Sequence, residues 1–259
     1  MKNLIKTADF KELFDISGIG DPLITNPHLF SFSRYEMPLA LSYEQQVLAA
    51  LTRVLKAECI VEFGTAEGVS TYTLAANMKE GGIVHTVDIE GGGDYKEACL
   101  RGDTVVGRCH RESPYAERVQ QYFRKDPMDR ITALECLKGS IDLIHVDADH
   151  SYKGVSTDTE EALTLSHEET VFLWHDFYPF PDYIEQGPER RGVYPYLNEL
   201  ATKGDMVLRR ITGTYFVVGC RAWREEETPG VLCQPDETPA PFGRHNVRLW
   251  ETSLPEPFI

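Results

Sequence analysis

From Cys59 onward, short apolar runs alternate with stretches whose apolar residues recur at helical spacing. The short runs are nearly continuous, which is typical of strands buried on both faces of a parallel sheet. The pattern predicts strands at Cys59–Phe63, Ile83–Asp88, Val119–Phe123, Ile141–Asp147, Val171–Asp176, Met206–Ile211 and Thr214–Cys220. It predicts intervening helices at Val69–Met78, Arg111–Glu117, Asp129–Leu137, Thr157–Leu165 and Val193–Leu200.

The alternation of strand and helix indicates an α/β fold with a doubly wound, mostly parallel sheet of seven strands. Only Thr212 and Gly213 separate the last two predicted strands. A connection this short cannot make the crossover that parallel strands need, so these strands must form an antiparallel hairpin. A mostly parallel sheet that ends in a hairpin departs from the dinucleotide-binding domains.

Two flanking segments differ in composition from this central region. Residues 1–57 are predicted to be an N-terminal, partly helical extension or cap, in which Ser42 and Gln45 form a capping box for a helix that ends near Lys56. Residues 58–221 are predicted to form the main domain. Residues 222–259 are rich in proline, and Trp250 and Phe258 indicate that this tail docks on the domain or on a partner.

Charge and composition exclude several classes of protein. The formal net charge of −15 argues against a nucleic-acid surface, which needs clustered Lys and Arg. No run approaches the roughly 20 apolar residues of a membrane span, and the N-terminus is charged too early for a signal peptide. We therefore expect a cytoplasmic protein that acts on a small molecule, with no membrane or nucleic-acid partner. A homodimer stays open.

The most informative segment is the turn after the first predicted strand, Glu62-Phe63-Gly64-Thr65-Ala66-Glu67-Gly68-Val69-Ser70. It predicts a strand, a tight turn and the start of a helix. Glycines in such a turn let backbone N–H groups approach a ligand closely. Asp88 ends the next predicted strand, and an acid about 20 residues beyond a glycine turn is placed to bind ribose hydroxyls.

Four acids lie at or near the carboxyl ends of predicted strands: Glu62, Asp88, Asp147 and Asp176. Ligands of open α/β sheets bind outside this edge. Like charges gathered there repel one another and raise each other's pKa values. A cationic ligand, ribose hydroxyls or a divalent metal would compensate for that repulsion.

The segment Glu62–Thr71 resembles the first motif of class I S-adenosylmethionine (SAM)-dependent methyltransferases. Its form, Gly-Thr-x-x-Gly-x-Ser-Thr, is similar to that of the small-molecule O-methyltransferase branch. Asp142–Tyr152 and Val171–Asp176 resemble the "DLIHIDGDHSY" and "HD" segments of a bacterial group within this branch. The resemblance covers the chain from Ser42 to Arg221. It implies a Rossmann-like methyltransferase fold, SAM as the cofactor and a small-molecule hydroxyl as the methyl acceptor.

The resemblance also implies a set of cofactor-binding residues: Glu62, Gly64, Thr65, Ala66, Gly68, Ser70, Asp88, Asp126 and Asp147. The turn would lie against the methionine part of SAM, with Glu62 supporting the turn or the amino group. Asp88 would accept hydrogen bonds from both ribose hydroxyls. Asp126, after the third predicted strand, is a weaker candidate for the adenine edge.

Removal of the acceptor proton has two alternative explanations. Related metal-dependent O-methyltransferases place one Asp after the fourth strand and an Asp–Asn pair after the fifth. Asp147 and Asp176 match the aspartates, but Phe177 stands where asparagine is expected. His175 suits Mn²⁺, Fe²⁺ or Zn²⁺ better than Mg²⁺, so Asp147, Asp176 and His175 are the candidate ligands for Mg²⁺ or Mn²⁺. Alternatively, His150 or His175 acts as the base beside Asp147.

Several side chains near these positions have two interpretations. Tyr152, Trp174, Phe177 and Tyr178 either wall a hydrophobic acceptor pocket or pack the core. Arg190-Arg191 either pairs with an anionic substrate group or is solvated. His145 lies mid-strand and is expected to be a core histidine.

Two other functions stay open. A nicotinamide-dependent dehydrogenase also needs a glycine turn and a ribose-binding acid, but Gly64-x-x-x-Gly68 lacks the GxGxxG form and the hairpin is foreign to that fold. A non-catalytic or regulatory protein can share the methyltransferase fold, because a fold does not imply an activity. The Phe177 position and the unassigned tail keep this alternative open.

Overall fold

The computed structural model describes residues 4–20, 39–91 and 106–232. The strands of its sheet are β1 (Lys6–Ala8), β2 (Cys59–Phe63), β3 (Ile83–Ile89), β4 (Val119–Arg124), β5 (Leu143–Val146), β6 (Val171–Trp174), β7 (Val207–Ile211) and β8 (Val217–Cys220). The described α-helices are α1 (Phe10–Leu13), α2 (Leu39–Val54), α3 (Val69–Asn77), α5 (Arg108–Arg111), α6 (Tyr152–Leu165), α7 (Pro181–Ile184) and α8 (Val193–Lys203). Short 3₁₀ helices lie at η3 (Ala116–Arg118) and η4 (Thr132–Leu137).

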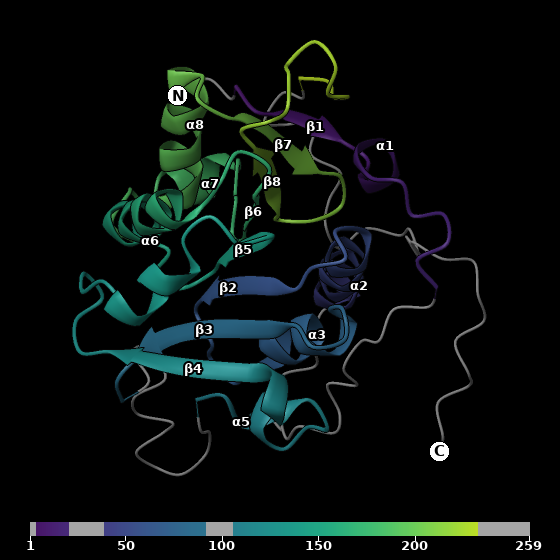
Figure 1. The fold of residues 1–259 in the computed structure, drawn as a ribbon. Helices are drawn as coiled ribbons and strands as arrows, with labels where there is room; N and C mark the ends of the chain where they lie inside the picture. Colours follow the sequence, from purple (N-terminus) through teal and green to yellow (C-terminus); the bar gives the residue numbers. More distant parts are fainter. Residues whose placement is uncertain (1–3, 21–38, 92–105, 233–259) are drawn as a thin grey trace.

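The sheet has the order β1-β7-β8-β6-β5-β2-β3-β4 (Figure 1). Only β8 runs antiparallel to its neighbours, β6 and β7, which confirms the mostly parallel sheet and the hairpin. The chain passes outward from β2 through β3 to β4 and then returns to β5 on the other side of β2. The strand order therefore reverses between β2 and β5, and ligands of open α/β sheets bind at such a switch point.

Helices cover both faces of the sheet, and the strands supply side chains to two cores (Figure 1). Successive residues of a strand point to opposite faces. Ile60 packs with α2 and α3 on one face, whereas Val61 and Phe63 pack with α6 and α8 on the other. Burial on both faces explains why the strands read as continuous apolar runs.

The sheet has one strand more than the seven predicted. β1 pairs in parallel with β7 at the edge, with Thr7 opposite Arg210. This segment was predicted to belong to a partly helical extension, and Lys6-Thr7-Ala8 contains no apolar run that would indicate a strand. The backbone of Thr7 also exchanges hydrogen bonds with Val231, at 2.7 and 2.9 Å. The described start of the C-terminal tail therefore lies against this edge strand.

Several helix predictions were wrong in their boundaries. Ser42 does not cap a helix, because α2 already begins at Leu39. The predicted helix Arg111–Glu117 is instead the end of α5 followed by η3, and the segment Asp129–Leu137 forms only the 3₁₀ helix η4.

Residues 233–259, which hold most of the predicted tail, lie outside the described residues. Among the residues that are described, none of the helices has both the length and the apolar character needed to cross a membrane.

Candidate active site

The glycine turn after β2 packs directly against the end of β5. Gly64 has a φ of +101°, a conformation that L-residues with a Cβ rarely adopt. A Cβ on Gly64 would also overlap the backbone carbonyl group of Asp147. The missing side chain therefore allows the turn to close over the switch point between β2 and β5.

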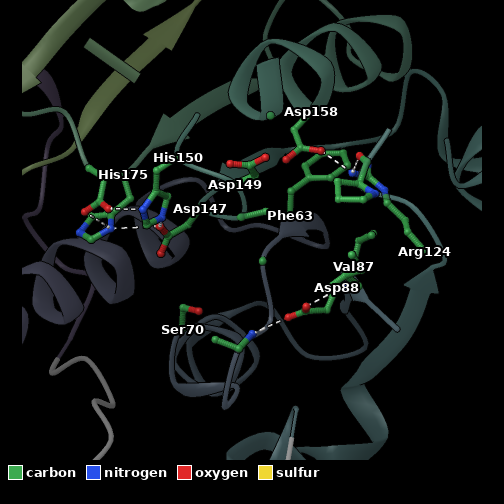
Figure 2. Close-up of a pocket in the computed structure, with 17 residues that line it drawn as sticks. Phe63, Ser70, Val87, Asp88, Arg124, Asp147, Asp149, His150, Asp158 and His175 are labelled. Atoms are coloured by element: carbon green, nitrogen blue, oxygen red, sulfur yellow. Dashed lines mark hydrogen bonds and ion pairs between the residues drawn. The ribbon is translucent and has the colours of Figure 1, made fainter. Parts of the chain in front are cut away.

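A cavity of about 530 Å³ lies at this edge of the sheet (Figure 2). The predicted site residues that line it are Gly64, Ala66, Ser70, Asp88, Asp147, His150, His175 and Asp176. Figure 2 shows Ser70 and Asp88 on one side of the cavity and the two histidines on another. One cavity therefore joins the predicted cofactor side to the predicted acceptor side.

Glu62 lies beneath the turn, is fully buried and does not line the cavity. Its Oε2 atom accepts hydrogen bonds from the hydroxyls of Thr71 at 2.5 Å and Thr86 at 2.7 Å. Its Oε1 atom lies 3.4 Å from Nδ1 of His145, which is buried as a core histidine should be. Thr65 is likewise buried and hydrogen-bonds Thr86. Of the two predicted roles of Glu62, this position fits support of the turn.

The hydrogen bond between Thr71 and Glu62 gives a stability prediction. Replacing Thr71 with valine is expected to lower the free energy of unfolding by about 1.5–3 kcal/mol, because it removes a buried hydrogen bond to a charged group. Urea denaturation measures this loss. Thr73→Val is the matched control on the same helix, since the Thr73 hydroxyl donates to the neutral carbonyl of Val69. Equal losses in the two variants would contradict the assignment.

Asp88 extends from the carboxyl end of β3 into the cavity. Its Oδ2 atom accepts a hydrogen bond from the backbone N–H of Ala66 at 2.7 Å, and Oδ1 accepts one from Ile89 at 2.7 Å. A carboxylate has further lone pairs, so these bonds leave capacity for ligand hydroxyls. Burial raises the pKa of Asp88, partly offset by these backbone hydrogen bonds.

Asp126 does not reach the cavity. It is exposed, and its Oδ1 atom accepts a hydrogen bond from the backbone of Met128 at 2.8 Å, which closes its own turn. The neighbouring residues Arg124 and Pro127 line the cavity in its place. The structure therefore gives no support to Asp126 as a reader of the adenine edge.

On the predicted acceptor side, Asp147, His150, His175 and Asp176 form a compact group, which we call the His–Asp cluster. His175 Nδ1 lies 3.1 Å from Asp147 Oδ1 and 3.3 Å from Asp176 Oδ1. His150 spans the same carboxylates, with Nδ1 2.7 Å from Asp176 Oδ2 and Nε2 3.4 Å from Asp147 Oδ1. Asp176 also has a positive φ of 59°, a strained conformation of the kind found at functional sites.

The residues predicted as metal ligands converge. One ligand atom from each of Asp147, His175 and Asp176 lies within 4.8 Å of the others. The next residue, Phe177, is fully buried and packs against Tyr194 with ring centroids 5.2 Å apart, so it offers the cluster no polar atom. The donor set is thus two carboxylates and an imidazole.

The histidines and aspartates of the His–Asp cluster stabilise one another's charged forms. Burial opposes the charge on His150, but hydrogen bonds to Asp147 and Asp176 outweigh it and raise the pKa of His150 to about 10. The pKa of His175 is also raised well above its ordinary value, by Asp147 and Glu44 against the effect of burial. The two histidines in turn hold the pKa of Asp147 well below its ordinary range, although burial acts in the opposite direction.

Two features of the site were not predicted. Glu44, from α2, lies with Oε2 3.1 Å from His175 Nε2, and no motif connects this helix to the strand ends. Arg124, at the end of β4, lines the cavity and forms buried ion pairs with Asp158 and Glu161 of α6. The sequence contains few signals for the Arg124 ion pairs. These were an arginine at a strand end and two acids three residues apart on a helix face.

The aromatic predictions divide into core and site. Trp174 is fully buried and stacks on Phe172, so it belongs to the core. Tyr178 instead faces the cluster, because its hydroxyl donates to Asp176 Oδ1 at 2.5 Å. The Arg191 guanidinium lies 5.0 Å from the ring centroid of Tyr178 and 3.9 Å from Asp176 Oδ2. Arg191 is therefore held beside the cluster.

Comparison with known proteins agrees with this fold. Residues 61–177 match a family model described as a methyltransferase domain. The uncharacterized protein y4gI of Sinorhizobium fredii is 30% identical over 163 residues, an alignment that covers 58% of this chain but only 16% of that protein. Cofactor-bound Rv0187 from MTB is 18% identical with a TM-score of 0.51, covering 78% of this chain and all of that one. A proposed caffeoyl-CoA O-methyltransferase from Staphylococcus aureus is 16% identical with a TM-score of 0.51, covering 74% and 88%.

The matched segment contains the glycine turn, Asp88 and the whole His–Asp cluster. The matched domain is of the kind that the turn motif resembles, and the shared fold agrees with it. The solved structures show the shared fold at low sequence identity.

Proposed function

We propose that this protein is a SAM-dependent methyltransferase that transfers the methyl group of SAM to a hydroxyl oxygen of a small-molecule acceptor. One observation carries the proposal: the glycine turn, Asp88 and the His–Asp cluster line the same cavity. Methyl transfer needs the acceptor oxygen in line with the sulfonium methyl group and needs its proton removed. In this cavity, Asp88 would bind the ribose hydroxyls and the cluster would lie beside the acceptor.

We further propose that Asp147, Asp176 and His175 hold a divalent metal ion. The donor set fits such an ion, because two carboxylate oxygens and an imidazole nitrogen converge within ligand-to-ligand distances. Imidazole with carboxylate suits Mn²⁺, Fe²⁺ or Zn²⁺ better than Mg²⁺. A bound metal of this kind supplies a Lewis acid that lowers the pKa of a hydroxyl.

The alternative base, His150, is less suited to the task in this arrangement. Both of its ring nitrogens face carboxylate oxygens, and its pKa of about 10 keeps it protonated at neutral pH. A protonated imidazole cannot accept the acceptor's proton. In this arrangement His150 neutralises the charges of Asp147 and Asp176. Turnover in the absence of a metal ion would favour His150 as the base again.

Three tyrosines pack together beside the His–Asp cluster, outside the residues that line the cavity. The Tyr178 ring lies 4.7 Å from Tyr183 and 4.4 Å from Tyr215, centroid to centroid. Arg191 lies over both Tyr178 and Tyr183, at 5.0 Å from each centroid. These rings support an acceptor with an apolar or aromatic body, which would pack beside the cluster.

Calorimetric titration with SAM, with and without Mn²⁺, tests the proposal, followed by a screen of phenolic and sugar hydroxyl acceptors for release of S-adenosylhomocysteine. We expect SAM binding and turnover that EDTA abolishes and Mn²⁺ restores. SAM binding without turnover of any acceptor would favour the non-catalytic alternative. Binding of NAD in place of SAM would favour the dehydrogenase.

A further inference from the structure

Glu44 is a buried carboxylate on a helix whose buried side chains are mostly apolar. It lies on α2, where its neighbours Val47, Leu48 and Leu51 belong to the core, and only 3% of Glu44 is exposed. A buried charge is costly unless it is paired and hydrogen-bonded. Both of its oxygens are engaged: Oε1 accepts the backbone N–H of Tyr215 at 2.7 Å, and Oε2 lies 3.1 Å from His175 Nε2.

These contacts define the orientation of the His175 ring. Nε2 faces an acceptor-only carboxylate, so it carries a proton. The opposite ring nitrogen, Nδ1, points to Asp147 and Asp176, at 3.1 and 3.3 Å. Because it also faces carboxylates, it carries a proton that a metal ion held by these aspartates would replace. The ring also packs against Phe216, with centroids 5.0 Å apart. Histidines that bind metals show this arrangement, donating the distal N–H to a carboxylate and presenting the other nitrogen to the ion.

We propose that Glu44 is a positioning residue that holds His175 with its Nε2 proton toward α2 and its Nδ1 atom toward Asp147 and Asp176, and thereby sets the metal affinity of the site. The inference rests on the proposed metal site. It links a helix that precedes the matched methyltransferase domain to the chemistry at the ends of β5 and β6.

A glutamine at position 44 tests this directly, because it has one acceptor and one donor where glutamate has two acceptors. The backbone N–H of Tyr215 is a fixed donor, so the glutamine oxygen must face it. The amide NH₂ then faces His175 Nε2 and requires that nitrogen to accept. The neutral ring then carries its proton on Nδ1, so a metal ion binds there only if the amide contact to Nε2 breaks.

The experiment compares Mn²⁺ binding by calorimetry in the wild type and Glu44→Gln. We expect affinity for Mn²⁺ to fall by about 10- to 100-fold, as is typical when the carboxylate behind a metal-binding histidine is lost. Glu135→Gln, an exposed site with the same change of charge, is the matched control and should bind Mn²⁺ like the wild type. Titration with SAM confirms that each variant is folded.

A spectroscopic readout separates positioning from a merely structural role. Long-range ¹H–¹⁵N spectra of the Zn²⁺-loaded wild type should show His175 protonated at Nε2 and not at Nδ1, and Glu44→Gln should lose this pattern. Should Glu44→Gln fail to fold, Glu44→Asp keeps the charge but is one methylene too short for both contacts, and its Mn²⁺ affinity should also fall.

The outcomes are distinct. Unchanged Mn²⁺ affinity in a folded Glu44 variant would overturn the inference while leaving the proposed metal site intact. A wild type that binds SAM but no Mn²⁺ would overturn the metal part of the proposed function, and this inference with it.

Discussion

Replacing Asp147 with asparagine is expected to lower kcat by about 10³-fold while SAM affinity stays within about tenfold of the wild type. Asp147 Oδ1 contacts both His175 and His150, and its side chain lies on the cavity wall between the glycine turn and the cluster. Asparagine keeps the shape but removes the negative charge that the proposed metal and both histidines use. Release of S-adenosylhomocysteine, with the first acceptor found in the screen, measures the loss.

Asp149→Asn is the matched control for this experiment. Asp149 lies two residues away and also lines the cavity, but its Oδ1 atom accepts only a backbone N–H, from Ser151 at 2.8 Å, among the contacts described. We expect its kcat to change by less than about tenfold. Comparable losses of kcat in both variants would mean that the overall negative charge of the cavity, and not Asp147 in particular, supports turnover.

The part of this site predicted from sequence depended on local chemistry. The glycine turn, Asp88 and Asp147 follow strands that are buried on both faces, and such strands leave an unmistakable apolar run. Parallel strands bring their carboxyl ends to one edge, so acids distant in sequence could be placed together. His175 and Asp176 followed from the same rule, and the structure brings His175 Nδ1 within 3.1 Å of Asp147 Oδ1 on the neighbouring strand end.

The contributions that escaped prediction depend on contacts between distant segments. β1 is only three residues long, and it is a strand because β7 offers it backbone partners. Glu44 lies on a helix whose sequence shows an amphipathic pattern but not which strand ends it faces. Its contact with His175 spans 131 positions. Asp126 was misplaced for the opposite reason, because a side chain near a strand end can close its own turn instead of facing the ligand.

Replacing Asp88 with asparagine is expected to weaken SAM binding by at least about 10²-fold. The ionised carboxylate would accept two ribose hydroxyls, and each hydrogen bond to a charged group contributes about 1.5–3 kcal/mol. Asparagine keeps one acceptor oxygen but presents an NH₂ donor in place of the second acceptor. Asp205→Asn, an exposed change ahead of β7, should bind SAM like the wild type. Calorimetry measures all three proteins.

The same residue gives the pH dependence of cofactor binding. Burial raises the pKa of Asp88 above the ordinary carboxyl value. Ribose hydroxyls donate to the ionised form, so SAM binding favours loss of the proton. Affinity should therefore be full above the raised pKa and fall by up to about tenfold per pH unit as pH drops below it. Asp88→Asn removes the titrating group and should lack this acidic limb. An acidic limb that persists unchanged in the variant would assign the titration to another group, and would argue that Asp88 does not bind the ribose.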